Sequence, residues 1–352
     1  MMKDLVKNAI INNPKIPIQI IKEIKSIAID IGINKIYLAG GAIRDLMIQS
    51  LNELPYKEVT DFDLVVEGSA IKLAKAIESN IEKDRLSGLI LFSEYDTASI
   101  KIDGYSIDLA SARTETYPEP GENPIVNYTN IENDLFRRDF TINSIALDLT
   151  KFNVIDPHNG KKHIKTKELH LLYNKSVEDD PTRVIRAARY CSRLNFKLTK
   201  STLDQIKSTI KYWPWTVREN STFPPALGTR LRAELELLFE ESNSINALLK
   251  LKNWDGFLLL DDKLHKDKLW QNRLEWAFRL KIKMLTAFIA GSSNPVELSK
   301  RLGLAKKQQI ILTEAQNIHS ILEDVYKKKE YLNWKLSKWC NLIESENWDP
   351  DS

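Results

Sequence analysis

The chain has 352 residues, of which 43% are hydrophobic and 28% are charged, and its formal net charge is +3. This composition is ordinary for a globular protein of two or three domains, and the mild charge neither requires nor excludes a nucleic acid partner. No apolar run approaches a membrane span, and no apolar leader opens the chain. The two cysteines, Cys191 and Cys340, lack metal-ligand spacing. We therefore expect reduced thiols in a cytoplasmic protein without a membrane anchor.

The first 80 residues alternate between helical and strand patterns. Residues 16–32 carry apolar side chains at helical spacing, and "KIYLAGGAIRDLMIQS" predicts a buried strand, a glycine turn and a helix opening at Ala42 or Ile43. "DFDLVV" predicts a second strand, and residues 69–80 predict a helix. This order is typical of an α/β unit.

The pattern changes along the rest of the chain. Residues 89–112 predict two or three strands with a turn at Asp103-Gly104, and "TYPEPGENPIVNY" predicts a loop because it is rich in Pro, Gly and Asn. Residues 131–150 begin as a helix and end as a strand, and the patterns after about residue 165 are almost only helical. We expect an α/β head followed by a helical remainder.

Asp61 and Asp63 flank one phenylalanine at the start of an apolar run. Side chains alternate along a strand, so the two carboxylates share one face and Phe62 points into the core. Two like charges side by side need compensation, and carboxylate oxygens suit Mg²⁺. Asp108 interrupts a later alternating strand and is the candidate third carboxylate. The alternatives are a solvent-facing pair of acids and an ordinary edge-strand Asp.

Gly40 and Gly41 lie between a strand and a helix, with Arg44 one turn further on. Glycines there let backbone amides approach a phosphate at the positive end of the helix, and a guanidinium can reach the same anion. An ordinary tight turn with a surface arginine is the alternative. A phosphate cradle beside paired carboxylates is the arrangement that phosphoryl transfer requires.

A second polar cluster contains Arg137, Arg138, Asp139 and Asn143 within "DLFRRDFTINSIALDL". The i, i+4 spacing of Asp139 and Asn143 predicts a shared helix face. A guanidinium suits a triphosphate, and Asp or Asn suits ribose hydroxyls. A solvated surface cluster is the alternative.

A third cluster follows in "SVEDDPTRVIRAARYCSRLNF", where Asp180, Arg183, Arg186 and Arg189 step by three residues. Pro181 suits the first turn of a helix. An acid and a guanidinium together can hydrogen-bond the edge of a base. A helix with i, i+3 salt bridges is the alternative.

The ordered set of motifs resembles the class II tRNA nucleotidyltransferases (CCA-adding enzymes) and their bacterial poly(A) polymerase relatives. Each motif is weak alone, whereas the set is specific. The resemblance covers roughly residues 35–240 and rests on these segments: "LAGGAIRD", "DFDLVV", "DLASARTETYPEPG", "DLFRRDFTINSIALDL", "IDPHNG" and "DDPTRVIRAARYCSRLNF".

The resemblance implies an α+β fold, with a polymerase-β-like nucleotidyltransferase head on a small mixed sheet and an all-helical neck, body and tail. We predict a head at residues 1–150, a base-reading neck at 151–215, and a body and tail that bind tRNA at 216–352. The implied activity is template-independent addition of C, C and A to the tRNA 3′ end from CTP and ATP, with release of pyrophosphate.

The resemblance also assigns roles. Asp61 and Asp63 would bind catalytic Mg²⁺, and Asp108 would complete the carboxylate set. The incoming nucleotide would be held by the glycine turn and by the second and third clusters. In chain order its ligands would be Gly40, Gly41, Arg44, Arg138, Asp139, Asn143, Asp180, Arg183, Arg186 and Arg189. Of these, Asp180 and Arg183 would read the base, with Arg186 and Arg189 as support.

The chain departs from the family pattern after "IDPHNG". His163 and His170 stand where the family usually has an Asp and an Arg, so a structural ion pair is missing. Addition of CC only, of A only, or of a poly(A) tail stays open. A non-catalytic RNA-binding protein is the alternative from another class, although such a binder has no need of paired carboxylates. The sequence predicts no protein partner.

Overall fold

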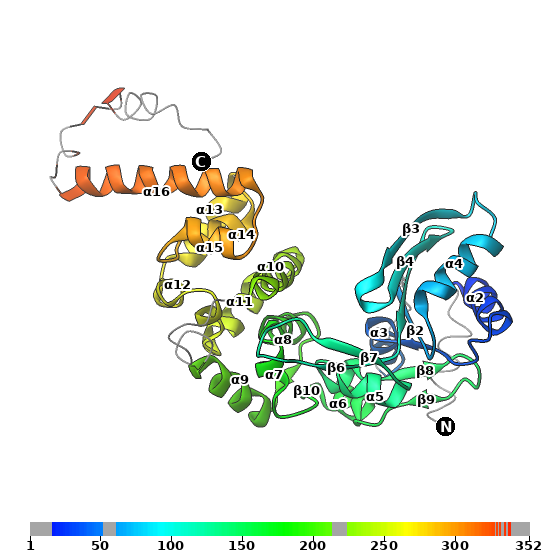
Figure 1. Ribbon diagram of the computed structural model, residues 1–352. Helices are drawn as coiled ribbons and strands as arrows, with labels where there is room; N and C mark the ends of the chain where they lie inside the picture. The colour runs from blue at the N-terminus through cyan, green and yellow to red at the C-terminus, as the bar shows by residue number, and fades with distance from the viewer. Residues whose placement is uncertain are drawn as a thin grey trace. The chain divides into compact units, whose positions relative to one another are not determined.

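The computed structural model describes residues 16–51, 61–212 and 224–327, together with 329, 331, 334, 335, 337 and 338. The chain divides into two compact units (Figure 1). The first comprises Met1–Ser176 and Asn195–Leu203, and the second comprises Val177–Leu194 and Asp204–Ser352. The predicted division into head, neck and body remains a prediction.

The first unit is built on a seven-stranded mixed sheet with the strand order β3-β4-β5-β2-β1-β8-β9. Its strands are β1 (Ile36–Ala39), β2 (Asp61–Val66), β3 (Leu86–Phe92), β4 (Thr97–Ile102), β5 (Tyr105–Ser111), β8 (Ala146–Asp148) and β9 (Val154–Ile155). Only β2 and β5 pair in parallel, and the other neighbouring strands pair antiparallel. The small mixed sheet that we expected is confirmed.

The helices of this unit are α2 (Ile18–Asp30), α3 (Gly41–Leu51), α4 (Ala70–Asn80), α5 (Ile131–Phe136) and α6 (Gly160–Thr166). Local signals set their ends. The hydroxyl of Ser69 caps α4 by accepting a hydrogen bond from the Lys72 N–H. Leu73 and Ile77, one turn apart on α4, are fully buried. Their spacing is the amphipathic pattern that predicted this helix.

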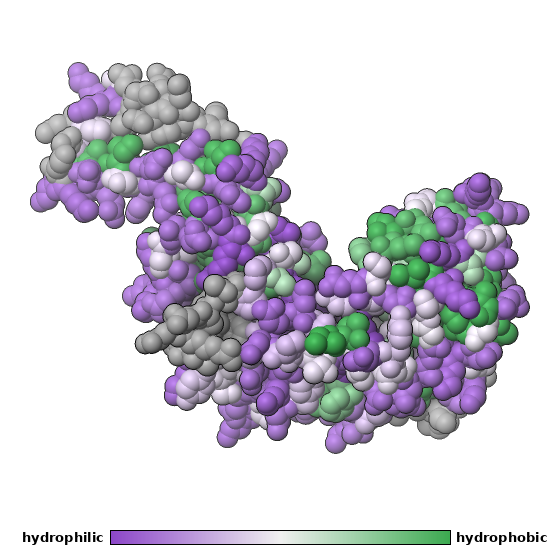
Figure 2. Space-filling view, viewed as in Figure 1, coloured by the Kyte–Doolittle hydropathy of each residue, from purple (hydrophilic) through white to green (hydrophobic). Residues whose placement is uncertain are grey.

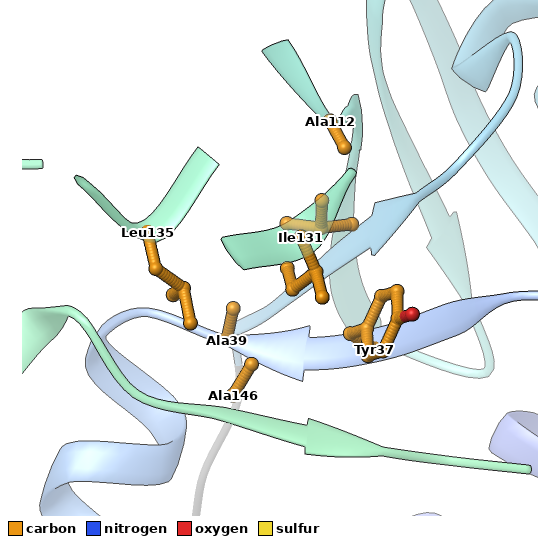
Figure 3. Packing of buried hydrophobic residues seen from close by; sticks show 7 residues of the cluster. Tyr37, Ala39, Ala112, Ile131, Leu135 and Ala146 are labelled. Atoms are coloured by element: carbon orange, nitrogen blue, oxygen red, sulfur yellow. The ribbon is translucent and has the colours of Figure 1, made fainter. Parts of the chain in front are cut away.

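One part of the core joins the sheet to α5 (Figure 3). It consists of small and medium apolar side chains from β1, β2, β8, α5 and the end of β5: Tyr37, Ala39, Val65, Ala112, Ile131, Leu135 and Ala146. Because side chains alternate along a strand, Asp63 lies on the same face of β2 as Val65. The face that packs against α5 therefore also carries the catalytic candidate Asp63. Phe62 is 1% exposed, as expected for the opposite face.

The predicted loop at residues 116–128 is partly wrong. Two short strands, β6 (Arg113–Thr116) and β7 (Ile125–Tyr128), pair antiparallel across it. The connection between the two strands is rich in Pro and Gly, and this composition favoured a loop prediction. The pairing itself depends on contacts between the two strands, which local composition does not reveal.

The second unit is helical, as expected. Its helices are α8 (Thr182–Arg193), α10 (Pro225–Glu240), α11 (Ser244–Asn253), α12 (Asp262–Lys266), α13 (Trp270–Arg279), α14 (Met284–Ile289), α15 (Pro295–Arg301) and α16 (Lys306–Lys327). Phe257 anchors the core between the edges of Phe288 and Trp270, with ring centroids at 4.9 and 5.7 Å.

Three further pieces complete the description. Helices α7 (Ser176–Asp179) and α9 (Lys200–Tyr212) each cross a boundary between the units. Two-residue strands β10 (Glu168–Leu169) and β11 (Lys197–Leu198) pair in parallel in the first unit.

Within the described ranges, every helix is too short or too polar to cross a membrane. Figure 2 shows apolar residues gathered over the β3–β4 end of the sheet, where Ile90 and Phe92 are 57% and 50% exposed.

Candidate active site

The turn between β1 and α3 requires glycine at position 40 for two reasons. Its φ is +73°, a conformation that other residues rarely adopt. A Cβ at Gly40 would also lie 2.5 Å from Asp63 Oδ2 and 3.4 Å from Arg138 Nη1. A carboxylate and a guanidinium therefore approach the backbone of this turn closely. The predicted glycine turn is confirmed, and it brings together Gly40, Asp63 and Arg138.

Asp63 and Asp108 are direct partners in the parallel pair β2–β5, which places them on the same face of the sheet. Asp63 is half-buried, Asp108 is exposed, and the Gly41 N–H donates to the Asp63 carboxylate. Burial raises the pKa of Asp63, and the negative charge of Asp108 adds to this effect against the opposing charge of Arg138. Because a bound cation would relieve the repulsion between the two carboxylates, Asp63 is well suited to be a cation ligand.

The backbone of Asp61 pairs with Ser106 at the start of β2, but its side chain lies outside what the structure describes. Among the described side chains, no group of three or more acids, histidines or cysteines is placed to hold a metal ion. The assignment of Asp61 and Asp63 as Mg²⁺ ligands therefore stays a prediction. The chemistry of the paired carboxylates at positions 63 and 108 fits a hard cation.

Arg44, Asn143 and Asp139 form one buried network. Arg44 Nη1 donates to Asn143 Oδ1 at 2.7 Å, and Asn143 Nδ2 donates to Asp139 Oδ1 at 2.9 Å. Arg44 also donates to the Asp45 carboxylate at 2.7 and 2.9 Å. Arg44 is 3% exposed. Its surroundings thus differ from those of the surface arginine that we considered as an alternative.

The shared helix face predicted for Asp139 and Asn143 is wrong. Helix α5 ends at Phe136, and Asn143 lies in the 3₁₀ helix η2 (Thr141–Asn143). The side chains still meet, because the chain turns at η2, where the Asn143 N–H donates to the Phe140 carbonyl at 2.9 Å. A tight turn, and not a helix face, therefore brings the two residues together.

Asp134 is a site residue that the sequence reasoning missed. It is fully buried. Its Oδ2 accepts from Arg138 Nη2 at 3.1 Å, and its Oδ1 accepts from Arg137 Nε at 2.9 Å and from the Arg113 N–H at 3.2 Å. An acid three and four residues before paired arginines on a helix was the available signal. Asp134 therefore fixes Arg138, whose Nη1 also donates to the Asn143 carbonyl at 3.3 Å.

In the second unit, Asp180 lies just before α8, two residues ahead of Thr182. Its Oδ1 accepts from the Thr182 N–H at 3.2 Å and from the Thr182 hydroxyl at 2.8 Å. Arg230 of α10 also lies 3.2 Å from the same oxygen. Arg183, which follows in the first turn of α8, is 4% exposed. The two residues predicted to read a base are thus fixed at the start of one helix.

Arg186 and Arg189 point to another helix, so the alternative of i, i+3 salt bridges within α8 does not describe them. Arg186 Nη1 donates to Glu234 Oε1 at 2.6 Å, and Arg189 Nη2 donates to Glu234 Oε2 at 3.2 Å. Arg189 also lies 3.5 Å from Glu241. The sequence reasoning missed Glu234, which joins α10 to α8.

A family model described as the poly A polymerase head domain matches residues 36–170. The A-adding tRNA nucleotidyltransferase of Aquifex aeolicus is 40% identical over 179 residues, which is 49% of this chain and 20% of that protein. The CC-adding tRNA nucleotidyltransferase of Deinococcus radiodurans is 31% identical over 229 residues, which is 63% of this chain and 54% of that protein.

Residues 36–170 of the chain are thus similar to the poly A polymerase head domain, and both sequence relatives are named tRNA nucleotidyltransferases. A solved structure described as the complex of a CCA-adding enzyme with CTP shares the fold of this chain, with a TM-score of 0.66. It is 23% identical, and the match covers 92% of this chain and 76% of that one. The matched segments span less than two thirds of the length of either sequence relative. The family model covers the glycine turn and the carboxylates but ends before Asp180.

Proposed function

We propose that the chain is a template-independent RNA nucleotidyltransferase that adds C, C and A to the 3′ end of tRNA from CTP and ATP and releases pyrophosphate. One observation carries this proposal. The half-buried Asp63 lies beside Asp108 and against the Gly40–Gly41 turn, and the guanidinium of Arg138 approaches the same turn at Gly40. Carboxylates beside a backbone turn and a guanidinium are what transfer to a phosphate needs, because the reaction depends on positioning and on charge compensation.

Different residues would bind the metal ion, the triphosphate and the ribose. Asp61 and Asp63 would hold Mg²⁺, with Asp108 beside them. When bound, the ion would neutralise charge that develops on the phosphate oxygens and on the attacking hydroxyl. Arg138 is 15% exposed and lies at the turn, so it is suited to contact the triphosphate. The buried Arg44 is suited to hold Asn143 in position for the ribose, in addition to its predicted contact with the triphosphate.

Base choice would rest on Asp180 and Arg183 at the start of α8. An acid accepts hydrogen bonds and a guanidinium donates them, so the pair can match the edges of both cytosine and adenine. Arg186 and Arg189 would support these residues by fixing α8 to α10 through Glu234. The helices of the second unit would bind tRNA through its backbone and shape. We propose that this activity is cytoplasmic.

Addition of the terminal A alone is a second candidate. The 40% identical relative from Aquifex aeolicus carries the name A-adding tRNA nucleotidyltransferase. If the chain shares that specificity, a second enzyme in the cell must add the two C residues first. Both candidates use the same carboxylates and the same glycine turn.

The deciding experiment uses three tRNA transcripts that end at the discriminator base, at the first C and at the second C. Each is incubated with CTP alone, ATP alone or both, in the presence of Mg²⁺. Addition of three nucleotides to the shortest transcript, with no further growth, supports CCA addition. Incorporation of A only into the transcript that ends in CC supports the A-adding activity. Tight binding of tRNA without any incorporation would contradict nucleotidyl transfer.

A further inference from the structure

Two histidines lie stacked beside the site. The rings of His163, in α6, and His170, directly after β10, have centroids 3.7 Å apart and planes inclined by 18°. This separation brings the rings into face contact. Where the resemblance led us to expect a missing ion pair, the chain has a stacked pair of titratable rings.

The two histidines hold Thr141 from two sides. His163 Nδ1 is hydrogen-bonded to Thr141 Oγ1 at 2.8 Å. The Thr141 N–H donates to the carbonyl of His170 at 3.0 Å. The start of α6 also packs against this residue, because a Cβ at Gly160 would overlap the Thr141 carbonyl. Thr141 therefore has little freedom to move.

Thr141 opens η2, the short helix that ends with Asn143. The Ser144 N–H donates back to the Thr141 carbonyl at 3.1 Å, and the Asn143 N–H donates to the Phe140 carbonyl at 2.9 Å. Asn143 in turn accepts from Arg44. A continuous series of contacts thus runs from the histidine rings to the predicted nucleotide site.

The charge state of the pair matters for this support. Burial lowers the pKa of His163, and the His170 ring and Lys162 lower it further, while Glu168 and Asp156 oppose the shift. Glu168 Oε2 also lies 3.3 Å from His170 Nε2. Two protonated rings in face contact repel each other at short range.

We propose that His163 and His170 are positioning residues that hold the Thr141–Asn143 turn for nucleotide binding while their rings are uncharged, and that protonation of the pair weakens nucleotide binding. The inference rests on the proposed function, since it assumes that Asn143 contacts the nucleotide. A proton that must leave before binding weakens the apparent affinity by up to about tenfold for each pH unit below the relevant pKa.

The test compares dissociation constants for CTP and ATP between about pH 8 and about pH 5.5, a range that brackets the ordinary histidine pKa of about 6.5. The proteins are the wild type, the double variant His163→Asp/His170→Arg and the control His319→Gln. The double variant carries fixed opposite charges throughout this range. The triphosphate titrates equally in every sample, so only the difference between proteins is interpreted.

The wild type and the His319→Gln control should lose more affinity than the double variant as the pH falls to about 5.5, by up to about tenfold. Parallel curves for all three proteins would overturn the inference. Failure of every protein to bind either nucleotide at pH 8 would instead contradict the proposed function, and the inference would fall with it.

If the double variant does not fold, a second measurement on the wild type tests the inference. The chain has five histidines, so their ring signals can be followed by NMR as the pH changes. By linkage, saturating nucleotide must lower the pKa of His163 in the wild type. Unchanged pKa values on nucleotide binding would refute the coupling. In the Thr141→Val variant the shift should shrink, because the hydroxyl contact is lost.

Discussion

Replacement of Asp134 by Asn tests how the site is held together. The Asp134 carboxylate accepts hydrogen bonds from Arg137, from Arg138 and from the backbone of Arg113. An amide of the same size fills the same space but carries no charge and has one oxygen fewer to accept. Two guanidiniums that are only 18% and 15% exposed would then lose their common counter-ion.

The magnitude follows from burial. Removal of one partner of a buried ion pair costs about 3–5 kcal/mol, because the remaining charge stays out of water. Arg137 retains Glu115, at 2.7 Å, and Arg138 retains the Asn143 carbonyl. We therefore expect a loss near the lower end of this range, about 3 kcal/mol in the free energy of unfolding of the first unit.

The loss should depend on pH in a defined direction. Burial by itself would raise the pKa of Asp134, but the charges of Arg138 and Arg137 outweigh it and hold the pKa below its ordinary value. A lowered folded-state pKa gives stability above the unfolded pKa of about 3.9 and loses it as the pH falls through the folded-state value. The gap between wild type and Asp134→Asn should therefore close in acid.

The assay is urea unfolding at pH 7 and in acid, read by hydrogen exchange on peptides from β1, β2 and β5. Glu132→Gln is the matched control, since Glu132 is exposed on the same helix. The control should change stability by less than about 0.5 kcal/mol. A loss below about 1 kcal/mol for Asp134→Asn, or a loss that is equal at both pH values, would refute the reasoning.

Three further predictions concern other parts of the molecule. Gly40→Ala should abolish incorporation and destabilise the fold, because its Cβ would meet Asp63, whereas Gly104→Ala, at a φ of +85° with open space around it, should cost only about 1 kcal/mol and leave incorporation intact. Glu234→Ala removes the acceptor of two α8 arginines and should lower the free energy of unfolding of the second unit by about 2–3 kcal/mol, which is measured as a lower urea midpoint. An unchanged midpoint would contradict the role of Glu234. Burial raises the pKa of Cys191 to about 12, so with the other cysteine replaced by serine the native protein should resist thiol reagents at pH 8 and react once unfolded.

Local signals allowed most of the first unit to be predicted. The turn at Asp103-Gly104 was expected because both residues tolerate positive φ, and their φ values are +50° and +85°. The helix at residues 69–80 was expected, and in the structure Ser69 caps it. The β6–β7 pair was missed because neither strand carries a local sequence signal for its partner, and the prolines in the connection favoured a loop.

In the candidate site too, features that depend on consecutive residues were predicted, and contacts between distant residues were missed. Gly40 and its neighbours were predicted because a strand, a glycine turn and a helix are consecutive in the chain. Glu234 was missed because it meets Arg186 across 48 residues of sequence, and no local pattern encodes that contact. A shared helix face was expected for Asp139 and Asn143 from their spacing, but the two side chains meet across a turn.

The central claim is that the carboxylates at the glycine turn catalyse nucleotidyl transfer. Asp63→Asn tests it most directly in a single-turnover assay with labelled tRNA that ends in CC and with ATP, together with a measurement of tRNA binding by the same sample. We predict that incorporation falls by at least about a thousandfold while tRNA binding changes little, because the variant loses a charge required only in the transition state. Incorporation within a few-fold of the wild type would contradict the account.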